Sequence, residues 1–266
     1  MNEALQMAQG TPPDGRRFAG RTVVVTGGAA GLGRAHALAF GGLGAHVVLA
    51  DIAADGMDET RRQVVAAGGT ASCHVCDMAD EQAIGAFAAQ VLAAHPAIDV
   101  LINNAGLHQG EIARGFFGLG QAKWQHFLAV NTLAPLLLAE ALRPALAAAR
   151  GLIINKSSMA SYQPATAYGI TKACLNVLTH AMAMQFAADE VRCVGIAPGL
   201  METPAARAGV EDENWQRLRA MQMVRRQGTA ADIAAMAVFL ASPEGSFVNA
   251  QVLLCDGGNQ MRGFRI

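Results

Sequence analysis

The chain has 266 residues, of which 52% are apolar and 15% are charged, and its formal net charge is −1. The apolar fraction excludes an intrinsically disordered chain. The near-neutral charge argues against a nucleic acid or an anionic membrane surface as partner, because either would require a basic patch. The length allows one large domain or two small ones.

The hydrophobic pattern predicts strands and helices that alternate along the chain. Short apolar runs predict strands at 21–26, 45–51, 70–77, 100–104, 151–157, 191–198 and 251–255. Helical patterns predict helices at 32–41, 57–67, 81–94, 124–149, 167–188 and 231–241, and 199–228 is expected to be irregular or loosely helical. Such alternation requires a mostly parallel sheet with right-handed crossovers. We therefore predict an α/β fold, a single Rossmann-like doubly wound parallel sheet of about seven strands with helices on both faces.

The domain organisation is expected to be simple. No Pro/Ser-rich linker or repeat divides the chain, so residues 18–266 are predicted to form one domain. Residues 1–17 contain an early acid and no apolar core, so we expect a disordered lead-in rather than a secretory signal. The most apolar stretch, 133–149, is interrupted by charged residues and prolines, so no membrane span is predicted.

Five cysteines in a chain of this length favour reduced thiols and a cytoplasmic location. Cys73 and Cys76 form a C-x-x-C motif within a predicted strand. Residues three apart on a strand face opposite sides, so buried structural cysteines are favoured over a metal or redox pair. No histidine has metal-ligand spacing, and no bound metal is expected.

A glycine cluster between Thr26 and Gly33 follows the first predicted strand and opens a helix. Glycines by themselves are also typical of an ordinary tight turn. At this position, however, they allow a pyrophosphate to approach the backbone, while the helix offers its free N–H groups to the anion. The position therefore favours a dinucleotide site.

Asp51 ends the second predicted strand, about twenty residues further on, where an acid can accept hydrogen bonds from the adenosine ribose. Its carboxylate would repel a 2′-phosphate, and neither Ile52 nor Ala30 supplies a compensating positive charge. This predicts NAD rather than NADP. The alternative is a solvated Asp or a helix cap.

Tyr168 and Lys172 are four residues apart on a predicted helix and therefore share a face. A nearby ammonium group favours the phenolate and lowers the pKa of a tyrosine, which would make Tyr168 usable as a general acid/base near neutral pH. Ser158 lies upstream and could donate to a substrate oxygen.

Several motifs in family order make the chain resemble a single-domain short-chain dehydrogenase/reductase of about 250 residues. The resemblance spans residues 18–258. The matching positions are the T-G-x-x-x-G-x-G turn at 26–33, Asp77 with Met78, N-N-A-G at 103–106, Asn131, Y-x-x-x-K at Tyr168 and Lys172, Pro198-Gly199, Thr203 and D-G-G at 256–258.

The resemblance implies a catalytic set of Asn131, Ser158, Tyr168 and Lys172. Tyr168 would exchange a proton with the substrate oxygen, which Ser158 holds. Lys172 would lower the pKa of Tyr168 and bind the nicotinamide ribose, and Asn131 would hold a water that links Lys172 to solvent. The implied NAD-binding residues are Gly27, Ala30, Gly31, Leu32, Gly33, Asp51, Ile52, Asp77, Met78, Asn104, Ala105, Gly106, Tyr168, Lys172, Pro198, Gly199, Met201 and Thr203.

Two features depart from the family pattern. Ser158 precedes Tyr168 by ten residues instead of about a dozen, which leaves Ser157 as the alternative to Ser158. Lys156 stands where an apolar strand residue is usual. Because a buried unpaired lysine is costly, we expect Lys156 to extend to the surface or to reach an acid.

The expected function is NAD-dependent hydride transfer between nicotinamide and a secondary alcohol or ketone. The alternatives are a non-catalytic dinucleotide sensor and an epimerase or dehydratase on the same fold that uses bound NAD. Residues 199–228 are expected to form a lid, whose apolar members indicate a partly hydrophobic, medium-sized substrate or ordinary packing. His108 and Gln109 are further candidates for the pocket wall. Family members usually form dimers and tetramers through the long helices, so a homo-oligomer is expected.

Overall fold

A seven-stranded parallel sheet forms the centre of the computed structural model, which describes residues 15–203, 206–207, 210 and 212–262. Its strands are β1 (Thr22–Thr26), β2 (His46–Asp51), β3 (Thr70–Val75), β4 (Val100–Asn103), β5 (Leu152–Lys156), β6 (Arg192–Pro198) and β9 (Val252–Cys255). The strand order is β3-β2-β1-β4-β5-β6-β9, and every neighbouring pair is parallel. The predicted doubly wound α/β fold is confirmed.

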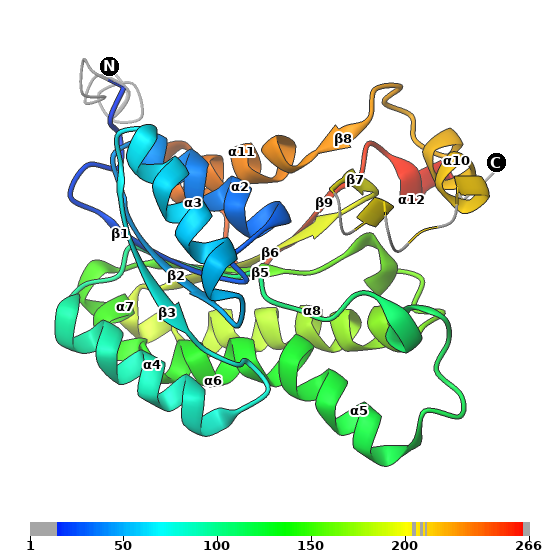
Figure 1. Cartoon of the computed structure of the whole chain (residues 1–266), viewed down its shortest axis with the longest axis horizontal. Helices are drawn as coiled ribbons and strands as arrows, with labels where there is room; N and C mark the ends of the chain where they lie inside the picture. The colour runs from blue at the N-terminus through cyan, green and yellow to red at the C-terminus, as the bar shows by residue number, and fades with distance from the viewer. Residues whose placement is uncertain (1–14, 204–205, 208–209, 211, 263–266) are drawn as a thin grey trace.

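Helices cover both faces of the sheet (Figure 1). One face packs against α2 (Gly31–Gly42), α3 (Ala54–Ala66) and α11 (Ala230–Ala241), and the other against α4 (Glu81–Ala94), α6 (Ala134–Ala141), α7 (Arg143–Ala149) and α8 (Ala167–Gln185). The strand side chains alternate between these layers: Val24 belongs to one buried cluster, and Val23 and Val25 to the other. The remaining elements are η2 (Gly110–Ala113), α5 (Gly120–Leu128), η3 (Ala129–Leu133), η4 (Met159–Ser161), η5 (Ala187–Asp189), β7 (Met201–Glu202), α10 (Asp212–Ala220), β8 (Gly228–Thr229), η6 (Pro243–Gly245) and α12 (Asn259–Arg262).

The single long helix predicted over 124–149 is wrong. The structure has α5, a π-helical segment η3, α6 and then α7, and the axis bends by 66° at the break before Arg143. Pro144 lies in the first turn of α7. Because proline lacks an N–H and its ring clashes with the preceding turn, the helix ends and a new one begins there.

The predicted lead-in over 1–17 falls mainly on residues 1–14, which lie outside the described residues. The predicted lid over 199–228 contains β7, α10 and β8. Among the described residues, no single helix combines the length and apolarity needed to cross a bilayer; only the bent pair Gly120–Ala141 and Arg143–Ala149 meets that test jointly. Cys73 and Cys76 pack on opposite faces of the sheet, as their spacing predicts.

Candidate active site

A cleft of about 1230 Å³ lies beyond the carboxyl ends of the central strands. Most of the residues predicted to bind the cofactor or substrate line it: Gly27, Ala30, Gly31, Leu32, Asp51, Ile52, Asp77, Met78, Asn104, Ala105, Gly106, Ser158, Tyr168, Pro198, Gly199, Met201 and Thr203. Three others, Gly33, Asn131 and Lys172, are buried behind its wall. The cleft therefore gathers residues from almost the entire length of the chain.

The glycine turn fits close approach of a dinucleotide. A Cβ on Gly33 would lie 1.9 Å from the Gly27 carbonyl oxygen, so only glycine allows the helix to pack against the turn. Gly31 has φ +54° and faces open space in the cleft. Ala30, at the N-cap of α2, supplies no side-chain acceptor to the first helical N–H groups. These groups remain available to an anion such as pyrophosphate.

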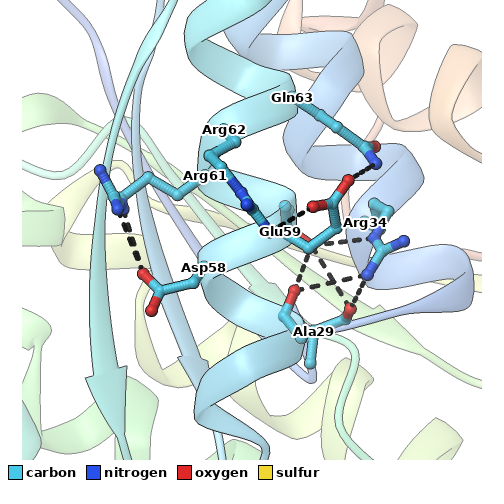
Figure 2. A network of polar contacts seen from close by, with 9 residues as sticks. Ala29, Arg34, Asp58, Glu59, Arg61, Arg62 and Gln63 are labelled. Atoms are coloured by element: carbon cyan, nitrogen blue, oxygen red, sulfur yellow. Dashed lines mark hydrogen bonds and ion pairs between the residues drawn. The ribbon is translucent and has the colours of Figure 1, made fainter.

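Arg34 fixes this turn against α3 (Figure 2). Its Nε donates to Thr60 Oγ1 at 3.0 Å, and its Nη2 donates to the carbonyl oxygens of Ala29 and Gly56. The neighbouring pairs Asp58–Arg61 and Glu59–Arg62 join residues within α3. The Arg34 guanidinium is thus engaged on the α3 side of the turn, where it holds the backbone in place.

Asp51 is held in the cleft by the backbone. Its Oδ2 accepts from Ala29 N at 3.0 Å and its Oδ1 accepts from Ala53 N at 3.0 Å. Each carboxylate oxygen can accept further hydrogen bonds, for example from ribose hydroxyls. The only positively charged side chains among the described residues that line the cleft are Arg114 and Lys156, which belong to other segments than the turn and β2.

Asn104 joins the segment after β4 to the glycine turn. Its Nδ2 donates to Thr26 O at 2.9 Å and to Gly27 O at 3.1 Å. Its buried Oδ1 has no hydrogen-bond partner within the described part of the chain. Because buried acceptors are usually satisfied, this oxygen marks a place where a ligand donor fits.

Tyr168 lies in the first turn of α8, where Thr166 caps the helix by accepting from Gly169 N at 3.1 Å. The Ser158 hydroxyl, which accepts from Ala160 N at 3.1 Å, lies close enough to Tyr168 to lower the pKa of its phenol. Ser157 instead donates to Asn176 Oδ1 and contacts Ser161. The geometry therefore pairs Tyr168 with Ser158 and leaves Ser157 in a separate network.

The pKa of Tyr168 is raised, whereas the sequence predicted a lowered pKa. Burial raises it, and the Ser158 hydroxyl only partly opposes this shift. Lys172, expected to lower the pKa of Tyr168, instead donates from Nζ to the Lys156 carbonyl oxygen at 2.9 Å. The pKa of Lys172 is itself well below its ordinary value, because of burial and of the nearby Lys156 charge. The expectation was wrong because the spacing along a helix does not report how deeply both groups are buried.

Asn131 lies in the π-helical segment η3, a type of local distortion that is frequent at functional sites. Its Oδ1 accepts from Leu107 N at 2.7 Å, and its Nδ2 donates to Leu107 O and to Thr171 Oγ1. A Cβ on Gly106 would lie 2.9 Å from Asn131 Oδ1 and 3.3 Å from Lys172 Nζ. The amide and the ammonium therefore approach the same point behind the cleft.

Lys156 does not extend to the outer surface, and it reaches no acid among the residues that the structure describes. It is half-buried in the cleft wall, and burial lowers its pKa to about 8. The sequence marked it as unusual but did not place it in the site. Sequence reasoning also missed lining residues in segments without a motif, among them Ala113, Arg114, His126 and Asn214; His108 and Gln109 do line the cleft.

Comparisons with known proteins identify relatives along almost the whole chain. A family profile described as "Enoyl-(Acyl carrier protein) reductase" matches residues 27–260. A 2-keto-3-deoxy-L-fuconate dehydrogenase of Xanthomonas campestris pv. campestris is 36% identical over 91% of this chain and 81% of its own length.

Two solved structures share the fold. A 7α-hydroxysteroid dehydrogenase complexed with NADH and 7-oxo glycochenodeoxycholic acid has a TM-score of 0.86 and 31% identity, over 93% of this chain and 97% of its own. A protein from Beutenbergia cavernae with NADP bound at low occupancy has a TM-score of 0.83 and 35% identity, over 93% and 99% of the two chains. Together with the cleft geometry, these matches show that the chain belongs to the short-chain dehydrogenase/reductase family and is an NAD(P)-dependent oxidoreductase of hydroxyl or keto substrates.

Proposed function

We propose that the protein is an NAD-dependent oxidoreductase that transfers a hydride between nicotinamide and a secondary alcohol or ketone. The observation that carries this proposal is the proximity of Ser158 and Tyr168 in the wall of a cleft that also contains the glycine turn and Asp51. When bound, the dinucleotide supplies the hydride acceptor or donor.

Each group of residues has a separate task in this proposal. Backbone N–H groups of the turn would bind the pyrophosphate, Asp51 the adenosine ribose, and Asp77 with Met78 the adenine side. Pro198, Gly199, Met201 and Thr203 would border the nicotinamide, and Lys172 would bind its ribose.

Ser158 and Tyr168 would carry out the proton transfer. Their hydroxyl groups would hold the substrate oxygen, to which Tyr168 gives a proton during reduction and from which it takes one during oxidation. Asn131 and Lys172, which approach the same point beside Gly106, would connect Tyr168 to solvent through a water. A non-catalytic dinucleotide sensor would need no such proton-transfer groups.

The cofactor preference can be tested at Asp51. We expect kcat/KM with NAD to exceed that with NADP, because a 2′-phosphate would meet a carboxylate that two backbone N–H groups hold in place. Asp51→Ala should reduce the preference by about tenfold or more, by removing the repulsion and the ribose contacts together. The measurement is kcat/KM for both cofactors across a panel of secondary alcohols.

Asp55→Ala is the control, since Asp55 lies on α3 and does not line the cleft. Its cofactor preference should equal that of the wild type. A wild-type kcat/KM for NADP equal to or above that for NAD would refute the assignment of NAD. Binding of a dinucleotide without turnover across a broad panel would instead favour the sensor.

The raised pKa of Tyr168 predicts the pH dependence of the two directions. The protonated phenol, needed for ketone reduction, persists at neutral pH, whereas alcohol oxidation needs the phenolate. The kcat/KM for oxidation should therefore rise from pH 7 toward alkaline pH, and that for reduction should not. Parallel pH profiles in both directions would show that another group controls proton transfer.

The proposal extends to the substrate class, the assembly and the location of the protein. Leu200, Met201 and Leu218 line the cleft and favour a partly hydrophobic, medium-sized substrate.

Val177 and Met184 of α8 are 68% and 72% exposed, which supports burial of this helix in a homo-oligomer, as a tetramer or dimer. Light scattering at working concentration tests the assembly. We also propose a cytoplasmic location, supported by cysteines that are all free among the described residues.

A further inference from the structure

Lys156 occupies an unusual position in the cleft. It is the last residue of β5, and its carbonyl oxygen accepts from Lys172 Nζ, while Ser158 follows two residues later. Ile154 packs on the α2 and α11 face of the sheet, and side chains two apart on a strand share a face. The Lys156 side chain is therefore on that face, and it lines the cleft together with Leu32 and Pro198.

No acid in the described part of the chain balances this ammonium. Among the described residues, Lys156 takes part in no ion pair and no side-chain hydrogen bond. The titratable groups close enough to respond to its charge are His36 on α2, His108 after β4 and Lys172 on α8. All three are bases, burial lowers the pKa of each, and the Lys156 charge lowers it further. Burial of an unpaired charge is unfavourable, so a contribution to stability does not explain a lysine at this position.

We propose that the Lys156 ammonium makes the cleft bind the reduced dinucleotide more tightly than the oxidised one. This inference rests on the proposed function. The two redox forms differ by one positive charge, which the nicotinamide ring carries only when oxidised. Hydride transfer requires this ring beside the substrate carbon whose oxygen Ser158 and Tyr168 would hold, and Lys156 lines the cleft wall with these two residues.

The size of the effect follows from Coulomb's law. Two like charges several ångströms apart at an effective dielectric constant of about 20 repel enough to change an affinity by about tenfold or more. The pKa of Lys156 is about 8, so the group is mostly charged at pH 7. Tenfold tighter binding of the reduced form makes the potential of the bound couple about 30 mV more positive, which favours alcohol oxidation on the enzyme.

The test measures Kd of NAD⁺ and of NADH at pH 7, without substrate, by calorimetry and by NADH fluorescence. We expect Lys156→Met and Lys156→Gln to tighten NAD⁺ binding by about tenfold and to leave Kd for NADH within about twofold, since only the oxidised ring carries the charge. Lys156→Arg keeps the charge and should keep the wild-type ratio. Lys123→Met is the matched control, because Lys123 is exposed and pairs with Glu111.

The possible outcomes separate the alternatives. Equal weakening of both redox forms in the neutral variants would place Lys156 on the phosphates or ribose that the forms share, and would overturn the proposal. An unchanged ratio of the two Kd values would also overturn it. If the wild type bound neither NAD⁺ nor NADH, the proposed function itself would fail, so the two failures are distinguishable.

Discussion

Tyr168→Phe is expected to lower kcat by about a thousandfold, within the range found for removal of a general acid/base. The aromatic ring remains, so the packing of the first turn of α8 is kept, but the hydroxyl beside Ser158 is lost. The dinucleotide Kd should stay within about twofold, since most of the cofactor contacts lie elsewhere in the cleft. Steady-state kinetics and an NADH fluorescence titration on the same preparation measure both quantities.

Tyr162→Phe provides the matched control. Tyr162 is the only other tyrosine of the chain, is 43% exposed, and donates from its hydroxyl to Val252 O at 2.9 Å. This variant should retain activity close to that of the wild type. Full activity of Tyr168→Phe would remove Tyr168 from the proton transfer, and equal losses in both variants would indicate a structural effect.

Lys156→Met is expected to raise the free energy of unfolding of the ligand-free protein by about 2 kcal/mol at pH 7. Burial lowers the pKa of Lys156 from 10.5 to about 8, so the folded state disfavours the ammonium. Each pKa unit corresponds to about 1.4 kcal/mol, and we discount the total because the side chain is only half-buried. Methionine fills a similar volume without a charge.

The size of this effect depends on pH. Below the folded pKa the lysine is charged in both states, and the full penalty acts on the folded protein. The penalty decreases as the pH rises from about 8 and disappears above the unfolded pKa of 10.5. Urea unfolding at pH 7 and pH 10 should therefore show a larger gain at pH 7. Lys123→Met should give no gain, and a destabilised Lys156→Met at pH 7 would contradict the burial argument.

The alternation of strands and helices was predictable because each strand corresponds to a short local pattern of residues in the sequence. The run from Thr22 to Thr26 is apolar and β-branched, and the glycines that follow it mark the turn. The glycine turn and Asp51 were predictable because ligands of this fold bind where the strands end, and most other cleft positions followed from the resemblance to the family. Most of these positions do line the cleft, and their roles remain proposals.

The failures concern properties that no single segment determines. The apolar pattern of 124–149 continues through Pro144, but the backbone hydrogen bonds do not, so periodicity alone predicted one helix. The pKa of Tyr168 depends on burial by segments far apart in the chain, such as those that contribute Ile112 and Phe127 to the cluster against which Tyr168 packs. The burial and the unpaired charge of Lys156 depend on which face of the sheet its side chain joins and on the lack of an acid among the described residues there.

The π-helical segment at Asn131 implies a constraint on chain length as well as on chemistry. A π turn accommodates one residue more than the α-helical turn it replaces. Loss of one residue between α5 and α6 would leave a continuous α-helix whose flanking turns keep their register but lack the π turn that carries Asn131. Asn131 could then no longer hold both Leu107 and Thr171. Insertions and deletions in this segment should therefore be as rare during evolution as replacements of the asparagine itself.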